Sequence, residues 1–282
     1  MPRHLLLACT LAAAMVSLSS IPTDAQTKLR LLGWNVESGG NDPDVIAAQL
    51  EALGHYHIVA LTEVKRGNFG RYRDAVARGG NSSYQFVASR TGGDDSMLII
   101  YDQQRINLND VQELFNVEGN WMNDKNWRHR SPLIAKFYDR QERQMFFVMV
   151  NHLARGDETL RKSQAKGLRI WAAKQTLPVI AMGDMNFDYE IGTDEGNEGY
   201  DTFFEGGIYQ WVKPAEMIDT NWADDNEDGI DDYPNSILDF ACVANGAKSW
   251  GGVSKVIVRA GDFPDDEKTS DHRPVELEVT VP

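Results

Sequence analysis

Residues 178–186, Pro-Val-Ile-Ala-Met-Gly-Asp-Met-Asn, are the segment from which we interpret the chain. The apolar run starts at a proline and is broken by Gly183, which predicts a buried strand with an abrupt end. Side chains two residues apart on an extended backbone share a face, so Asp184 and Asn186 should converge. Gly183 would permit a turn and the close approach of a ligand. A carboxylate beside an amide suits a water held next to a phosphoryl oxygen, although a simple Asx-rich turn explains these residues equally well.

Residues 1–25 are expected to be a signal peptide outside the fold. Arg3 and His4 precede an apolar run over residues 5–18, and small or polar side chains follow as far as Ala25. The run is too short to span a bilayer, so we expect a secreted protein, periplasmic or extracellular, with no transmembrane segment. A lipid anchor is the alternative, but Cys9 comes before most of the apolar run.

The mature chain, residues 26–282, should form a single domain. Cleavage would leave Cys242 as the one cysteine, so stability must come from burial and not from an internal disulfide. The length is ample for one large core, and no internal repeat or linker divides the chain. We expect a monomer.

The net charge of −14 is concentrated in one segment. Residues 187–232 hold 15 acidic side chains and one basic one, an excess that equals the net charge of the chain. The remainder is therefore neutral and need not repel a polyanion. We interpret residues 187–232 as an acidic insertion in the domain.

Short apolar runs and a few helical patterns alternate along the mature chain. Asp42 and Pro43 predict the start of a helix that ends near Gly54, and a second helix is expected over residues 157–174. Strands are expected at residues 29–36, 56–61, 84–88, 97–101, 133–138, 145–150, 178–186, 237–243, 253–258 and 274–281. Many strands with few helices favour an α/β (α+β) fold, in which two stacked mixed β-sheets are flanked by helices.

Polar residues recur where the predicted strands end. Since each follows an apolar run, all of them could lie along one rim of the sheets, where loops on a rigid scaffold commonly carry function. The set combines carboxylates, amides and two imidazoles, and it lacks the cysteine or histidine spacing of a zinc site. The residues are Asn35, Glu37, Glu63, Asn151, His152, Asp184, Asn186, Asp239, Asp271 and His272.

Seven short motifs occur in a fixed order along the chain. They are WNVE at 34–37, TEV at 62–64, RSP at 130–132, NHL at 151–153, GDMN at 183–186, SILD at 236–239 and SDHRP at 270–274. The series, which spans residues 29–281, resembles the endonuclease/exonuclease/phosphatase family, which includes deoxyribonuclease-I-like enzymes, bacterial sphingomyelinases and inositol polyphosphate phosphatases. The resemblance implies a four-layer α/β sandwich and metal-dependent hydrolysis of phosphoric esters.

The resemblance also implies a site for Mg²⁺ or Mn²⁺. Glu63 matches the metal-binding glutamate of the family, with help from Asn35 or Asp271. A hard cation of this kind favours one or two carboxylates together with water and substrate phosphate. Glu37 stands where relatives often carry Asp and would reach the metal through water, or it is a solvated loop acid.

The catalytic roles follow from the same resemblance. Asp184 and Asn186 match the pair that orients the attacking water and a phosphate oxygen. Asp239 matches the acid that holds His272 and fixes its tautomer. Either Asp184 is the general base and His272 a stabilising cation, or the His272–Asp239 pair is the base. His152 matches a donor to the phosphate or to the leaving oxygen.

Arg130 falls where deoxyribonuclease-like members of the family place an arginine that contacts phosphate, and Asn151 is a second candidate for a phosphate contact. Arg155 and Arg161 follow His152 closely and could also meet an anionic substrate.

The acidic segment contains the front half of a calcium loop. Asp224, Asn226 and Asp228 are spaced as the first ligands, and a glycine follows at position six. Asn235 occupies position twelve, where a glutamate is expected, and Asp232 is a further candidate ligand. A structural Ca²⁺ and an unliganded acidic loop are the two interpretations.

Three functions remain open on the sequence. The first is a secreted Mg²⁺-dependent phosphodiesterase that acts on nucleic acid, as an endonuclease or exonuclease. The second is a sphingomyelinase-like enzyme for phospholipid or phosphoinositide head groups, and the third is an inactive binding module. One stretch of the chain suits either lipid contact or base stacking with phosphate binding. Its residues are Leu114, Phe115, Trp121, Met122, Lys125, Trp127, Arg128 and Arg130.

Overall fold

The computed structural model describes residues 27–124, 129–224, 226, 228–263 and 268–282. The expected signal peptide, as well as Lys125, Trp127 and Arg128, lie outside the described residues. No helix in the described part of the chain is long and apolar enough to cross a membrane.

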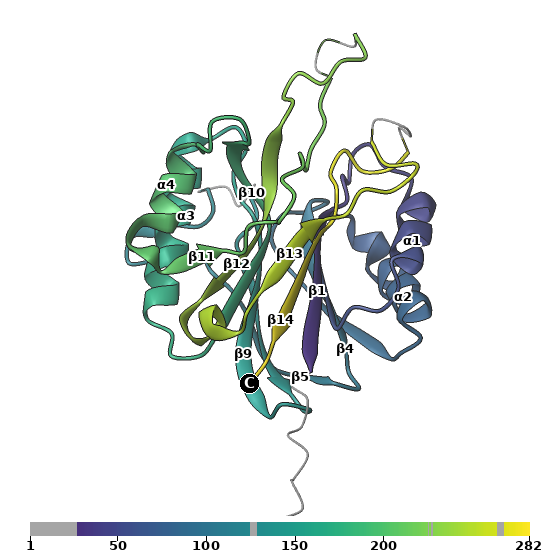
Figure 1. The fold of residues 1–282 in the computed structure, drawn as a ribbon, viewed down its shortest axis with the longest axis vertical. Helices are drawn as coiled ribbons and strands as arrows, with labels where there is room; N and C mark the ends of the chain where they lie inside the picture. The colour runs from purple at the N-terminus through teal and green to yellow at the C-terminus, as the bar shows by residue number, and fades with distance from the viewer. Residues whose placement is uncertain (1–26, 125–128, 225, 227, 264–267) are drawn as a thin grey trace, which may run out of the picture.

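Two six-stranded mixed sheets stack face to face (Figure 1). The first sheet has the strand order β13-β14-β1-β2-β4-β3, and the second has the order β11-β12-β10-β9-β8-β5. The first consists of β1 (Lys28–Asn35), β2 (Ile58–Val64), β3 (Tyr84–Ala88), β4 (Ser96–Asp102), β13 (Val253–Val256) and β14 (Val275–Thr280). The second consists of β5 (Ile106–Glu113), β8 (Leu133–Asp139), β9 (Gln144–His152), β10 (Val179–Glu190), β11 (Tyr209–Trp211) and β12 (Ser236–Ala244).

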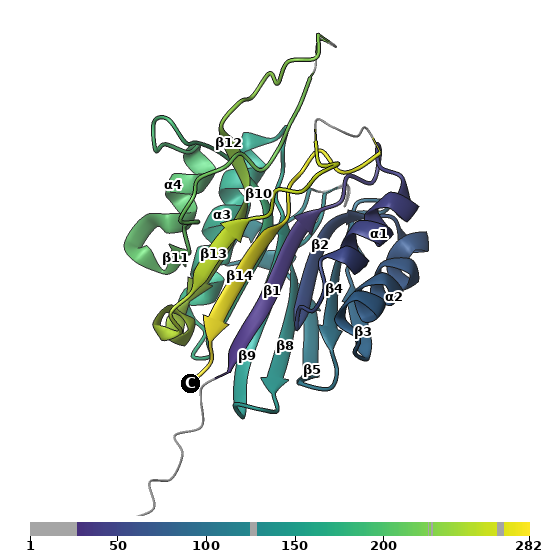
Figure 2. The same ribbon diagram turned by 45° about the vertical axis from the view of Figure 1, so that its right-hand side comes forward.

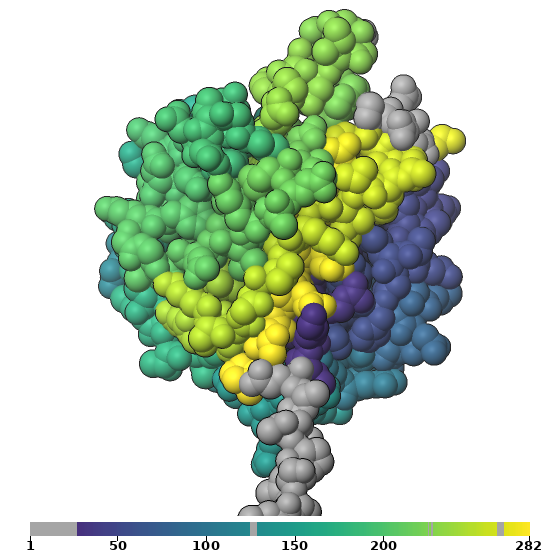
Figure 3. Space-filling model, viewed as in Figure 1, coloured from purple at the N-terminus to yellow at the C-terminus, as the bar shows by residue number. Residues whose placement is uncertain are grey.

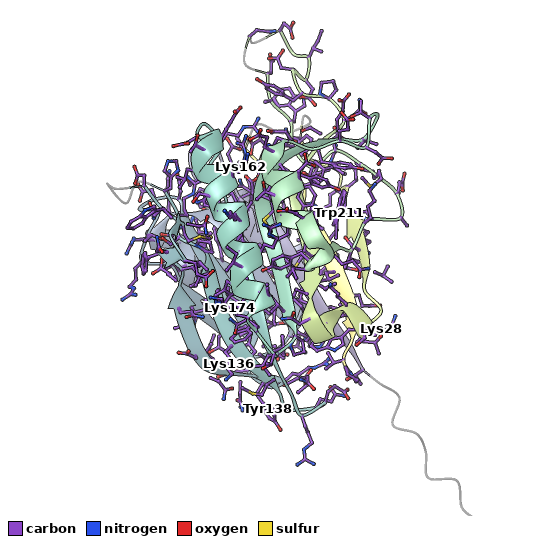
Figure 4. All side chains as sticks on the ribbon, turned by 90° about the vertical axis from the view of Figure 1, so that its left-hand side faces the viewer. Lys28, Lys136, Tyr138, Lys162, Lys174 and Trp211 are labelled. Atoms are coloured by element: carbon purple, nitrogen blue, oxygen red, sulfur yellow. The ribbon has the colours of Figure 1, made fainter. Side chains whose placement is uncertain are left out.

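Helices cover the outer face of each sheet, which gives four layers (Figures 1 and 2). α1 (Pro43–Ala52) and α2 (Phe69–Gly80) lie on the first sheet, and α3 (Glu158–Ala173) and α4 (Glu198–Phe204) lie on the second. Figure 4 shows α3 in front of the second sheet, with Lys162 and Lys174 near its two ends. A small hairpin, β6 (Asn116–Val117) and β7 (Asn120–Trp121), packs beside α3. This architecture confirms the expected α/β sandwich.

Each interface between layers has its own apolar core. Leu31, Phe137 and Val148 belong to the core between the sheets, because alternate side chains of a strand point to opposite faces. The other face of the first sheet packs on α1 and α2, and the other face of the second packs on α3 and α4. Strands buried on both faces read as continuous apolar runs, and for this reason the sequence located them well.

Part of the acidic segment, residues 187–232, packs in the body of the fold. α4 and β11 belong to the body of the fold, where the rings of Phe203 and Tyr209 stack 4.2 Å apart in the core beneath α3. Residues 222–224, 226 and 228–235, which we call the acidic arm, protrude from the rim between β11 and β12 (Figure 3). The aromatic residues around β11 cover the second sheet, so the arm is the part of the segment that projects from the body, and an insertion over residues 187–232 stays a prediction.

Gly183 is required by the neighbouring strand rather than by a ligand. Its φ is +122°, and a Cβ added there would lie 2.2 Å from the backbone oxygen of Asn151 on β9. The two residues are partners in the parallel β9–β10 ladder. The glycine thus lets β10 approach β9 closely just before Asp184, and this approach sets where Asp184 lies.

We predict that Gly183→Ala lowers the free energy of unfolding by about 2–4 kcal/mol, since the added methyl group meets backbone and the φ angle disfavours any L side chain. Gly192→Ala is the matched control, because its added Cβ has no neighbour closer than 3.9 Å. Urea denaturation of both variants measures the difference. Equal stability of the two variants would contradict this account of Gly183.

Candidate active site

The ends of central strands from both sheets meet at one rim beside the acidic arm. β1, β2 and β9 end there, β10 passes through the rim at Asp184 and Asn186, and the antiparallel strands β12 and β14 begin there. A pocket of about 320 Å³ opens at this rim. It is lined by Glu63, His152, Arg155, Asp184, Asn186, Asn221, Trp222, Ala223, Tyr233, Leu238, Asp271 and His272. Six of the ten strand-end residues named from the sequence thus share one pocket.

A group of possible metal ligands lies at the centre of the pocket. Nε2 of His152 is 3.4 Å from Oδ2 of Asp184 and 3.7 Å from Oε1 of Glu63. In the described part of the chain, this is the group in which three such ligand atoms lie within 4.8 Å of one another. Two carboxylates and an imidazole fit a divalent cation. Asp184 and His152 are thus candidate ligands beside Glu63, and the help expected from Asn35 or Asp271 stays a prediction.

The side chain of Asn35 is hydrogen-bonded to both Glu63 and Asp184. Its Nδ2 donates to Oε1 of Glu63 at 3.0 Å and to Oδ2 of Asp184 at 3.1 Å. Its oxygen accepts from the backbone N–H of Glu37 at 3.0 Å and so faces away from the two acids. In this orientation Asn35 acts as a donor that holds the carboxylates together, and a role as a metal ligand would require the amide to turn over.

Burial raises the pKa of several carboxylic acids at the rim. The pKa of Asp184 is raised to about 7, because loss of water disfavours the charged form and outweighs the attraction of His272. The pKa of Glu37 is also raised to about 7, first by burial and then by repulsion from Asp271. Burial raises the pKa of Glu63 and Asp271 in the same direction. A bound cation would lower these pKa values, so the acids fit a metal-binding role.

The backbone at the rim is strained where these acids are presented. Glu37, Glu63 and Asn186 have φ angles of 49°, 54° and 49°, a left-handed conformation that non-glycine residues seldom adopt. The backbone N–H of Asp271 donates to Oε2 of Glu37 at 3.0 Å, which binds the two loops to each other. Glu37 is therefore held in place behind the pocket and is not a freely solvated acid.

Asp184 and Asn186 converge, but not because they lie on a regular strand. The ladder between β10 and β12 is irregular from Asp184 to Tyr189. The backbone N–H of Asn186 donates to Oδ1 of Asp184 at 2.9 Å, which is the Asx turn named as the alternative. Nδ2 of Asn186 donates to the carbonyl of Leu153 at 2.9 Å. The expectation of an extended backbone was wrong here, and the turn itself brings both side chains to the pocket.

The surroundings of His152 and His272 shift the pKa values of the two imidazoles in opposite directions. Nδ1 of His272 is 2.7 Å from Oδ2 of Asp239. Burial lowers the pKa of His272, but the carboxylates of Asp239 and Asp271 more than reverse this and hold it well above its usual value. Burial, aided by Arg130, holds the pKa of His152 well below its usual value. At neutral pH His272 is therefore cationic and His152 neutral.

The structure does not bring Arg130 or Asn151 to the lining of the pocket. The side chain of Arg130 is 11% exposed, and its Nη1 is 3.7 Å from Oδ2 of Asp95 while Nη2 donates weakly to the carbonyl of Leu153. Asn151 is fully buried, and neither polar atom of its side chain has a partner among the described residues. Since it neighbours His152 on β9, its side chain points to the opposite face of the sheet.

Arg155 is the arginine that lines the pocket. Its Nη1 donates to Oδ1 of Asn186 at 3.2 Å and to Oδ1 of Asp188 at 3.0 Å. Its guanidinium lies 5.7 Å from the ring centre of Tyr233 on the acidic arm. Arg161 instead is buried and donates to the carbonyls of Ala154 and Arg155, which supports the loop.

Thr220 ties the Asp239–His272 pair together, and nothing in the sequence pointed to it. Its Oγ1 accepts from the backbone N–H groups of Leu238 and Asp239 at 3.0 and 3.2 Å. Its carbonyl accepts from the N–H of Arg273 at 2.8 Å. One fully buried residue therefore fixes the backbone of β12 against the segment that carries His272.

The candidate calcium ligands lie in the acidic arm, away from the central group. Asp224 accepts from the backbone N–H groups of Asp228 and Gly229, and Nδ2 of Asn226 donates to Oδ1 of Asp232 at 3.2 Å. These contacts describe a tight turn of acidic residues. A structural Ca²⁺ at this turn stays a prediction.

We predict that Thr220→Val lowers the free energy of unfolding by about 1–3 kcal/mol, because two buried N–H groups lose their acceptor. Thr62→Val is the matched control, since the hydroxyl of Thr62 is buried and has no partner among the described residues. Chemical denaturation of both variants and of Thr220→Ser, which keeps the hydroxyl, measures the effect. A Thr220→Val variant as stable as Thr62→Val would refute the role given to this hydroxyl.

No protein-family model and no curated protein matches the sequence. Solved structures do match. An endonuclease/exonuclease/phosphatase from Bacteroides vulgatus is similar with a TM-score of 0.66 at 15% identity, over 91% of this chain and 100% of that one. A mannosyl-6-phosphatase from Bacteroides thetaiotaomicron is similar with a TM-score of 0.64 at 18% identity, over 89% and 99% of the two chains.

D. rerio TDP2, in complex with a single-strand DNA product, is similar with a TM-score of 0.62 at 18% identity, over 90% of this chain and 99% of that one. At these identities the likeness establishes the fold, and it covers nearly the whole chain in each case. The chain therefore has the four-layer sandwich fold of the endonuclease/exonuclease/phosphatase family, as the seven ordered motifs predicted.

Proposed function

We propose that the chain is a secreted, divalent-metal-dependent phosphodiesterase that hydrolyses P–O bonds in nucleic acid by in-line attack of water. The observation that carries the proposal is the convergence of Glu63, Asp184 and His152 in a pocket that also contains His272. Mg²⁺ or Mn²⁺ bound to these carboxylates would neutralise charge on a phosphoryl oxygen. The names of the similar structures include a phosphatase and a protein with a DNA product, which supports a phosphate-bearing substrate.

Asp184 is the stronger candidate for the general base. Burial raises its pKa to about 7 in the metal-free protein, so the carboxylate holds a proton more strongly than an exposed aspartate does, and a bound cation would increase its ionised share at neutral pH. Asn186, which is hydrogen-bonded to the backbone beside it, would orient the attacking water. His272 keeps its proton at neutral pH and so is poorly suited to be the base. Its charge instead suits stabilisation of the negative charge that develops on the phosphorus oxygens.

His152 and Arg155 would contact the phosphate. Neutral His152 can donate one N–H toward the pocket without adding charge, and Arg155 can offer a charged donor beside Asn186. Arg130 would then not contact the phosphate itself. Its positive charge helps to lower the pKa of His152. This assignment moves the phosphate-contacting role from Arg130 to Arg155.

The other two hypotheses have less support. Of the apolar residues proposed for lipid contact, Leu114 and Met122 are buried, and Trp121 is the large exposed one among those described. An inactive binding module would not need two histidines with opposite charge states beside strained acidic residues. The phosphodiesterase therefore remains the best-supported function.

We predict that Glu63→Gln weakens Mg²⁺ binding by at least ~10-fold and removes most activity, because the central carboxylate is lost. Glu51→Gln on the outside of α1 is the control, since Glu51 pairs with Arg78 at the surface. Calorimetric titration of Mg²⁺ into both variants measures the affinity. If Glu63→Gln bound Mg²⁺ as tightly as the wild-type protein does, the metal would have to bind at a site other than Glu63.

The raised pKa values of Asp184 and Glu37 predict that metal binding releases protons. Both acids are partly protonated at pH 7 in the metal-free protein and must ionise when a cation binds. Mg²⁺ affinity should therefore rise as the pH increases from 6 to 8. Titrations in buffers of different ionisation enthalpy count the protons released. An affinity that is constant over this range would contradict the pKa assignments.

We predict that His152→Ala and His272→Ala each reduce turnover by at least ~10²-fold, the usual scale for a positioned acid–base group. His55→Ala is the control, because His55 lies at the opposite end of β2 and contacts Asp102. Steady-state hydrolysis of a chromogenic phosphodiester measures the rates. Near-normal turnover in both site variants would remove the basis of the proposed function.

A further inference from the structure

The pocket is closed on one side by the acidic arm. The arm lies between β11 and β12 at one edge of the second sheet, so it flanks the pocket on the β12 and β14 side. Trp222, Ala223 and Tyr233 of the arm line the pocket directly. A substrate seated over the central acids therefore meets an aromatic wall on this side.

The base of the arm is bonded to the site. The backbone N–H of Trp222 donates to the carbonyl of Asp271 at 2.9 Å, and Asn221 forms a β-bridge with His272. The N–H of Asp232 donates to the carbonyl of Ala223 at 2.7 Å, which joins the two sides of the arm. The wall is thus built on the same backbone that presents Asp271 and His272.

Beyond the wall, the arm carries concentrated negative charge. Asp228 and Asp232 are exposed, and Asp224 and Asp231 are partly exposed. Charges on the surface act over about 8–10 Å at moderate salt. A strand of phosphates that continued past Trp222 would therefore be repelled by the arm as well as blocked by the aromatic side chains.

Exposed arginines lie on the other side of the pocket, beyond Arg130. Past Arg130, a hollow of about 520 Å³ is lined by Arg66, Arg90, Thr91, Gly92, Gly93 and Phe115. The side chain of Arg90 is 83% exposed, while its partner Glu113 is buried. Asp94 is an exposed acid of this loop, and the side chain of Asp95, which is 42% exposed, lies 3.7 Å from Nη1 of Arg130. Exposed arginines beside an aromatic ring are suited to a single strand of nucleic acid.

We propose that the site acts at the end of a strand. The group on the arm side of the scissile phosphate is short and uncharged, and the rest of the strand runs past Arg130 toward Arg66 and Arg90. The inference rests on the proposed phosphodiesterase function and adds to it that internal phosphodiesters are poor substrates. The arm is the specificity-determining element.

The test compares three substrates in Mg²⁺: a linear single-stranded oligonucleotide, the same sequence closed into a circle, and bis(p-nitrophenyl) phosphate. The wild-type protein should hydrolyse the linear strand with a kcat/KM at least ~10-fold above that of the circle. Hydrolysis of the small diester without any preference for the linear strand would overturn the inference. Failure on all three substrates, the small diester included, would overturn the proposed function itself.

A variant of the acidic arm distinguishes an effect of its negative charge from an effect of structural damage to the pocket. Asp228→Asn with Asp231→Asn removes two charges, and each asparagine keeps the Oδ1 acceptor that the backbone uses. The rate on the circle relative to the small diester should rise about fivefold at low salt, and the gain should shrink as salt is added.

Asp110→Asn with Asp201→Asn removes the same charge from exposed positions away from the arm and should not change this ratio. A ratio that stays constant in the arm variant, or that rises equally in the control, would contradict the role of the arm.

Discussion

The cost of burying acidic groups close together is the constraint on which the rest of the rim depends. Asp184 and Glu63 face each other with a neutral imidazole, and the pKa of each is raised by burial. Such groups are costly to hold together unless a cation or a proton balances them. The protein stabilises the arrangement with donors, of which Asn35 is the clearest, and with a left-handed backbone at Glu63. The proposed metal-binding function would account for this strain.

The two sheets are the means by which these acids are positioned. Glu63 comes from the first sheet and Asp184 from the second, so the site exists only where the two layers meet. Gly183 allows β10 to lie close to β9, and Thr220 ties β12 to the segment that carries His272. The catalytic geometry is therefore a property of sheet packing, and residues outside the pocket should influence activity through it.

Much of the fold could be predicted because strands buried on both faces leave continuous apolar runs. α2 was missed, since its three glycines hide a short apolar face, and β5 was missed because this edge strand exposes most of its side chains. In the site, the ordered motifs located the central residues. They could not show that Arg155 would line the pocket in place of Arg130, because side-chain direction at a strand end depends on tertiary packing. Trp222 and Tyr233 carry no local signal and join the pocket only through the path of the arm.

The most direct test of the central claim is the position of a bound metal. Crystals soaked with Mn²⁺ give anomalous scattering that locates the ion without reference to activity. The account predicts one strong peak within coordination distance of Glu63, between it and Asp184, and loss of that peak in Glu63→Gln. Anomalous density confined to the acidic arm, or no peak at saturating Mn²⁺ in crystals of a protein that hydrolyses phosphodiesters, would contradict it.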